Sequence, residues 1–151
     1  MINIKKIILF IILTCLYIPE TNAAIKDSLF ASVGNKALTK SDILAELKVI
    51  LILNGQSFSE NKRKQLESAA INSCVKRTIK EIEIGKYGNL TFNKVDLEKE
   101  LSRLANNLNM DLDMLRNTLL ANDIDFSYLI NRITIELLWN SLIFSLYKDR
   151  I

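Results

Sequence analysis

Pairs of acidic side chains are the residues in this sequence that are best suited to chemistry. Asp111 and Asp113 form one pair, and Asp123 and Asp125 form another. Two carboxylic acids in unequal surroundings can divide the acid and base roles of a hydrolysis. Both pairs, however, stand where a helix is expected to begin, and a carboxylate there accepts backbone N–H groups and offsets the helix dipole. We therefore predict that these residues cap helices and are not catalytic.

The sequence lacks the residues that other common catalytic systems and metal sites need. The chain has no histidine, which removes Ser-His and Cys-His nucleophiles and histidine metal sites. Its two cysteines, Cys15 and Cys74, cannot form a thiolate cluster, and its four glycines are too scattered for a phosphate-binding loop. We expect no enzyme activity, no cofactor and no metal.

The N-terminus has the layout of a secretory signal peptide. Lys5 and Lys6 precede an apolar run over 7–18, and Thr21-Asn22-Ala23 offers a small-residue cleavage site. About 12 apolar residues are too few to span the roughly 30 Å of a bilayer core. We predict a signal peptide over 1–23 and an exported domain over 24–151. A lipoprotein acylated at Cys15 is the disfavoured alternative.

Charge and cysteine content limit the partners and the means of stabilisation. The formal net charge of the whole chain is +3 and falls by about one without residues 1–23, which is too weak to attract nucleic acid. Residues 24–151 suit one domain with one hydrophobic core. Cys74 would be the only cysteine left, so no disulfide can form within that domain. Because Cys74 lies among apolar residues at helical spacing, we expect a buried structural thiol.

Alternating and helical hydrophobic patterns predict the secondary structure. Two short strands over 29–33 and 36–38 flank Gly34-Asn35, which suits a tight turn. Apolar residues at helical spacing then mark five helices. We expect them over about 42–53, 59–84, 93–107, 111–120 and from 126 almost to the end, with Thr39 or Ser41 capping the first and Ser57 or Ser59 the second. The predicted fold class is mainly α, a multi-helix orthogonal bundle of about five helices with a small N-terminal β-hairpin.

The second of these helices is expected to be amphipathic. Its inner stripe would contain Leu66, Ala69, Ala70, Val75, Ile79 and Ile82. Its basic residues would lie mainly on a solvated outer face, among interspersed acidic residues: Lys62, Arg63, Lys64, Lys76, Arg77 and Lys80.

The last helix is apolar on nearly every side. Between Phe126 and Tyr147 only Arg132 and Glu136 carry charge. Such a helix must be surrounded by a core, a partner or a membrane. We do not expect a stable membrane span, because the charged residues would be costly within a bilayer.

The order of residue types resembles the N-terminal domain of SurA-like periplasmic chaperones over 31–151. The most specific block runs from Asn109-Met110-Asp111-Leu112-Asp113-Met114-Leu115-Arg116 through Leu119 and Asp123-Ile124-Asp125-Phe126 to Ile133 and Glu136. Ser32-Val33-Gly34-Asn35-Lys36 resembles that family's opening hairpin, and the stretch from Ile71 to Lys86-Tyr87-Gly88 its long second helix. The resemblance implies a periplasmic chaperone that holds unfolded polypeptides, especially outer-membrane β-barrel proteins, without ATP.

This chain differs from that family in two respects, which limit how much of the family's activity is expected of it. Family members continue into parvulin-type peptidyl-prolyl isomerase domains and a C-terminal segment, which are absent here, so we expect no isomerase activity. The family also usually carries basic residues in the fifth helix, where this chain has Ile130, Thr134 and Ile135. That difference makes the helix more apolar.

The late part of the fifth helix is the expected client-binding surface. A holdase needs accessible apolar surface, and methionine adds adaptable contacts. The predicted contact residues are Trp139, Leu142, Phe144, Leu146 and Tyr147, with Leu138 and Met114 behind them. The alternative is a non-catalytic structural or oligomerisation subunit, such as a homodimer or a chain completed by a partner, whose last helix packs on another chain. For each of the predicted contact residues, the alternative is that its side chain packs in the hydrophobic core.

Overall fold

The computed structural model describes residues 28–148. The predicted signal peptide over 1–23, with Cys15, lies outside the described residues. A two-stranded antiparallel hairpin precedes five helices, which confirms the predicted fold class. The elements are β1 (Leu29–Val33), β2 (Lys36–Thr39), α2 (Lys40–Leu53), α3 (Glu60–Ile84), α4 (Lys94–Asn107), α5 (Leu112–Leu120) and α6 (Phe126–Tyr147).

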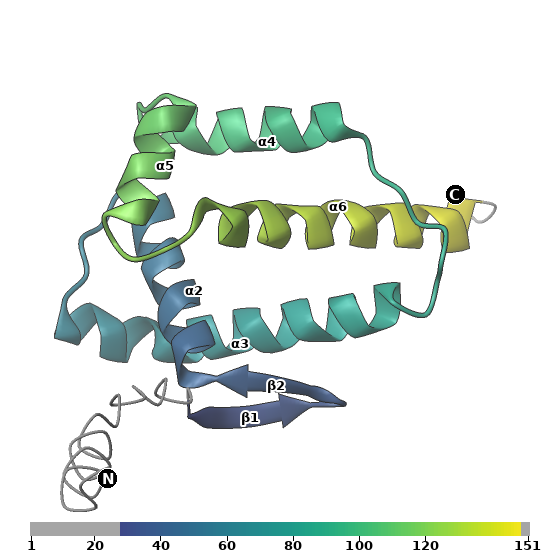
Figure 1. Ribbon diagram of the computed structural model, residues 1–151, viewed down its shortest axis with the longest axis horizontal. Coiled ribbons are helices and arrows are strands. Elements are labelled where there is room, and N and C mark those ends of the chain that lie inside the picture. The colour runs from purple at the N-terminus through teal and green to yellow at the C-terminus, as the bar shows by residue number, and fades with distance from the viewer. Residues whose placement is uncertain (1–27, 149–151) are drawn as a thin grey trace, which may run out of the picture.

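Three helices form a layer with α6 in its middle. Figure 1 shows α3 and α4 on either side of α6, and contacts join α6 to both neighbours. The chain runs in the same direction along α3 and α6 and in the opposite direction along α4. Helix α2 crosses this layer at the end where α6 begins, and α5 lies at that same end. The C-terminal half of α6 therefore extends away from the crossing helix.

The hairpin forms where it was predicted, and the first helix begins at Lys40 with Thr39, one of the two predicted caps, before it. Gly34 has a φ of +58° in the turn, a conformation that glycine adopts without strain. At the start of α2, the Thr39 hydroxyl accepts a hydrogen bond from the Asp42 N–H at 3.2 Å. The Thr39 N–H donates in return to the Asp42 carboxylate at 2.8 Å. This capping box explains why the strand changes into a helix at Thr39.

One residue of each acidic pair caps a helix. Asp111 and Asp125 each accept a hydrogen bond of 2.7 Å from a backbone N–H in the first turn of the helix that follows. Asp113 lies in the first turn of α5. Asp123 is not a cap, because it occupies a turn with a φ of +59°, and its carboxylate lies 3.4 Å from the Lys48 Nζ. The prediction of capping is thus confirmed for Asp111 and Asp125 and wrong for Asp123.

The hydrophobic core consists of two clusters that share α2. Toward α3 and the hairpin, α2 contributes Leu47 and Leu51, which pack with Cys74 of α3. Toward α4, α5 and α6 it contributes Val49 and Ile52. Each fully buried leucine contributes about 2 kcal/mol. Cys74 is completely buried, as predicted.

Helix α3 departs from the predicted division into an inner and an outer face. Ile79, expected in the core, is 51 % exposed, whereas Arg77, expected outside, is largely buried. The reason is that α3 packs against α2 on one side and α6 on another. A single amphipathic stripe cannot describe a helix with two buried sides.

Candidate functional site

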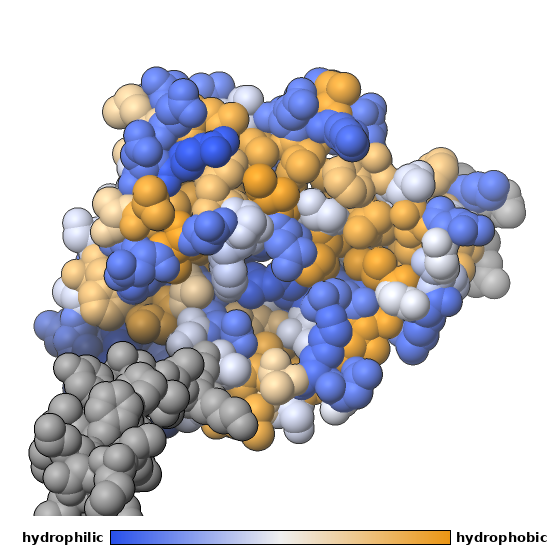
Figure 2. Space-filling model, in the orientation of Figure 1, coloured by the Kyte–Doolittle hydropathy of each residue, from blue (hydrophilic) through white to orange (hydrophobic). Residues whose placement is uncertain are grey.

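The C-terminal half of α6 presents large apolar side chains to solvent. The exposed fractions are 66 % for Phe144, 49 % for Leu146 and 45 % for Tyr147. Leu138 and Trp139 are half-buried beside them. In Figure 2 orange atoms gather over this part of α6 with blue atoms at their borders. We call Ile143, Phe144, Leu146 and Tyr147 the α6 apolar surface, since all four are exposed.

Leu142 belongs to the core rather than to this surface. It is 1 % exposed and lies two helical turns beyond Ile135, which is 4 % exposed. Residues seven apart lie on the same helix face, so both point into the protein. A client could not contact Leu142 in this conformation. Its placement among the contact residues was therefore wrong.

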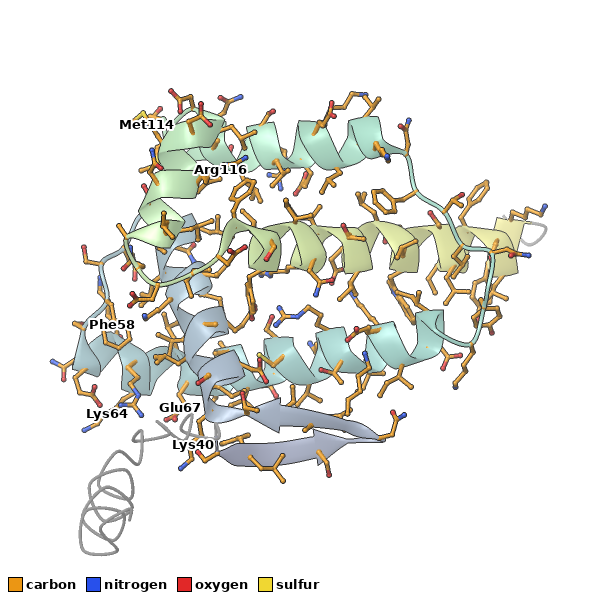
Figure 3. The ribbon with its side chains drawn as sticks, viewed as in Figure 1. Lys40, Phe58, Lys64, Glu67, Met114 and Arg116 are labelled. Atoms are coloured by element: carbon orange, nitrogen blue, oxygen red, sulfur yellow. The ribbon has the colours of Figure 1, made fainter. Side chains whose placement is uncertain are left out.

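Met114 is exposed but lies at the other end of the molecule. Figure 3 labels it on α5, near the start of α6. A 22-residue helix is about 33 Å long, so the whole of α6 separates Met114 from Tyr147. The short turn between α5 and α6 keeps α5 at this end. Met114, 51 % exposed, does not join the α6 apolar surface.

A buried carboxylate between α2, α3 and α6 was missed by sequence reasoning. Glu46 is completely buried on α2. It forms an ion pair with Arg77 of α3, and its Oε1 lies 3.4 Å from the Nε of Arg132 on α6. Ser73 donates a hydrogen bond to it at 2.6 Å and the Tyr128 hydroxyl another at 2.8 Å. One carboxylate thus joins three helices.

Electrostatics favour the charged form of Glu46. Burial by itself raises the pKa of the carboxyl, but the Arg132 and Arg77 guanidiniums and the hydrogen bonds from Arg77 and Ser73 outweigh burial and lower the pKa below its ordinary value. Burial, together with Glu46, raises the pKa of the Tyr128 hydroxyl, which stays protonated. The cluster is therefore a structural ion pair network. A sequence signal did exist, because the helical neighbours of Glu46 include Ile43, Val49 and Ile50.

A cleft of about 700 Å³ lies over α6, with α3 and α4 as its walls. Its apolar floor includes Leu129, Ile133 and Leu137, which follow one another on one face of α6. Most of its remaining lining is charged. Six cationic side chains face three carboxylates: Lys76, Arg77, Lys80, Lys99, Arg103 and Arg132 against Asp96, Glu100 and Glu136. Glu46, paired with Arg77 and Arg132, adds a fourth carboxylate.

Two of these cations lack a carboxylate of their own. Lys76 forms no ion pair within residues 28–148. Arg132 shares the Glu46 carboxylate with Arg77. In contrast, Lys80 and Glu136 pair with each other at 2.5 Å. The cleft therefore carries surplus positive charge over an apolar floor.

The composition of α6 also bears on a membrane. Among the helices within 28–148, α6 alone is long and apolar enough to cross a bilayer, by length and composition only. The core helix of a soluble protein passes the same test. Both charged residues of α6 are paired with neighbouring helices, Arg132 with Glu46 and Glu136 with Lys80. These pairs favour packing against protein.

Comparisons with known proteins add no relative. No protein-family model, no curated protein and no solved structure matches this chain.

Proposed function

We propose that this protein is an exported, periplasmic chaperone related to the N-terminal domain of SurA-like chaperones. It holds unfolded polypeptides, especially outer-membrane β-barrel proteins, without ATP and without catalysing a reaction. One observation carries the proposal, namely the α6 apolar surface, in which Phe144 is 66 % exposed. The family resemblance of the sequence supplies the class of client.

The physical support is a match between this surface and unfolded β-barrel chains. Such chains alternate apolar and polar residues and carry aromatic side chains. Phe144 and Tyr147 present aromatic rings, and Leu146 lies between them in the sequence. Contiguous apolar surface of this kind marks interaction sites on soluble proteins. The ion pair network beneath α6 keeps the helix in place without covering its end.

A structural or oligomerisation subunit is the second candidate. The observation that favours it is the same exposed helix end, because a second chain packed there would bury Phe144, Leu146 and Tyr147. Isologous pairing of two such helices is the simplest arrangement. Light scattering during size-exclusion chromatography tests this candidate, which predicts that the chain from Ala24 onward forms a dimer and that Phe144→Ser weakens it.

The decisive experiment measures aggregation of a urea-unfolded outer-membrane β-barrel protein after dilution. The chain from Ala24 onward is added at increasing ratios, and light scattering is followed. We expect suppression near stoichiometric ratios. The variant Phe144→Ser, with or without Trp139→Ser, should weaken suppression while far-UV circular dichroism stays unchanged.

Leu120→Ser is the matched control. Leu120 is 65 % exposed, almost as much as Phe144, but it lies at the end of α5. If the α6 apolar surface binds clients, only Phe144→Ser loses activity. No suppression by a folded wild-type sample, or equal loss in both variants, would contradict the proposal.

A further inference from the structure

We infer that the cleft over α6 binds extended polypeptide segments in which acidic side chains stand next to apolar ones. This inference rests on the proposed chaperone function and adds a charge preference to it. The cleft and the α6 apolar surface would form one continuous track for a client.

Continuity along α6 connects the two regions. Ile133, Leu137 and Asn140 line the cleft, and Phe144 follows them with the spacing of one helix face. Trp139 lies beside the same track, since its ring is 5.8 Å from the Nζ of Lys80 in the cleft wall. A chain lying along α6 would therefore pass from the cleft to the exposed aromatic residue.

The surplus positive charge of the cleft favours a ligand with negative charge. Among the described residues, Arg132 pairs with no carboxylate except that of Glu46, which it shares with Arg77, and its side chain is 29 % exposed. Lys76 of the α3 wall has no partner carboxylate within 28–148. Charges at a partly desolvated site interact more strongly than charges in bulk water. An acidic side chain of the ligand would give these cations a counter-charge.

The floor of the cleft explains why the ligand must also be apolar. Leu104 of α4 and Leu129, Ile133 and Leu137 of α6 line it. Volumes of this size suit ligands that bury apolar groups and fix their orientation with a few polar contacts. At about 3.3 Å for each extended residue, the length of α6 accommodates about ten residues. The ligand is thus a short extended stretch of an unfolded chain.

The test compares three fluorescein-labelled peptides of about ten residues, identical in their leucine and phenylalanine positions. Their intervening positions carry glutamate, lysine or serine, and binding to the chain from Ala24 onward is measured by fluorescence anisotropy. We expect the glutamate peptide to bind about tenfold more tightly than the lysine peptide at low salt, with the difference shrinking at high salt.

Two charge-reversal variants on α3 locate the preference. Lys76→Glu places a carboxylate in the cleft wall and should reduce the preference for the glutamate peptide about fivefold. Lys64→Glu makes the same change in net charge on the same helix, and Lys64 does not line the cleft. We expect this control to keep the preference of the wild-type protein.

Each outcome decides between the two proposals. Equal binding of all three peptides would overturn the charge preference and leave the chaperone function standing. Equal effects of Lys76→Glu and Lys64→Glu would show attraction by net charge and would overturn the assignment to the cleft. Failure of every peptide to bind, together with no suppression of β-barrel aggregation, would overturn both.

Discussion

Replacement of Glu46 by glutamine tests whether one buried carboxylate joins the three helices. The variant keeps the shape of the side chain but removes the charge that Arg77 and Arg132 share. Removing one partner of a buried ion pair costs about 3 to 5 kcal/mol, because the other charge stays desolvated. The Arg77 side chain is only 14 % exposed, whereas Arg132 at 29 % regains water more easily.

The lower end of that range is therefore the expected magnitude. We predict that Glu46→Gln lowers the free energy of unfolding by about 3 kcal/mol, out of a total of about 5 to 15 kcal/mol for a domain. The melting temperature should fall by about 12 °C. Urea unfolding followed by far-UV circular dichroism measures the difference directly.

A matched glutamate on α6 provides the control. Glu136 pairs with Lys80, but its side chain is 50 % exposed. Glu136→Gln should cost less than about 1 kcal/mol, as exposed ion pairs do. A cost for Glu46→Gln no larger than that of Glu136→Gln would refute the proposed role of the buried carboxylate.

The stability difference between the wild-type protein and Glu46→Gln should depend on pH. The pKa of Glu46 is lowered in the folded state below its ordinary value of 4.5. A group with a lowered folded pKa contributes stability above its unfolded pKa and loses it as the pH falls through the folded pKa. The stability gap between wild type and Glu46→Gln should be full above about pH 5 and shrink in more acidic buffer. A constant gap down to strongly acidic pH would contradict this assignment.

Three further variants or probes address other parts of the structure. Leu142→Ala should cost about 2 to 5 kcal/mol in urea unfolding because it leaves a cavity, whereas Phe144→Ser should change stability by less than about 0.5 kcal/mol. Because burial raises the pKa of the Cys74 thiol to about 11, iodoacetamide at mildly basic pH should label Cys74 only after unfolding; rapid labelling of the native protein would contradict its burial. Thr39→Ala should cost about 1 kcal/mol through loss of the capping box, and an unchanged urea midpoint would refute that contribution.

Local features of the structure follow largely from the sequence. Thr39, Asn93, Asp111 and Asp125 cap four of the helices, and each cap is satisfied by atoms within three residues. Helical spacing of apolar residues places the segments between them. These interactions join neighbours in the chain, so the residue types alone determine them.

The candidate site could be predicted only in part. The excess of apolar residues singled out the end of α6 but left open whether they were buried, and the structure shows that Phe144, Leu146 and Tyr147 are accessible. Helical periodicity could not decide which side of α6 its neighbours cover. It therefore grouped Leu142, which is buried, with its exposed neighbours. Met114 was included because methionine makes adaptable contacts, although the length of α6 keeps it away from the exposed end.

Tertiary structure alone decided the burial of Glu46 and the existence of the cleft. The carboxylate receives its partners from Arg77 and Arg132, which lie 31 residues and more along the chain on two other helices. A lone glutamate in a helix ordinarily stays in water, because burying a charge costs several kcal/mol without partners. Only the crossing of α2 over α3 and α6 supplies those partners, and the same layer places α3 and α4 as walls beside α6. Local propensity builds the helices, but the packing of helices distant in sequence determines which of their charges and apolar faces meet.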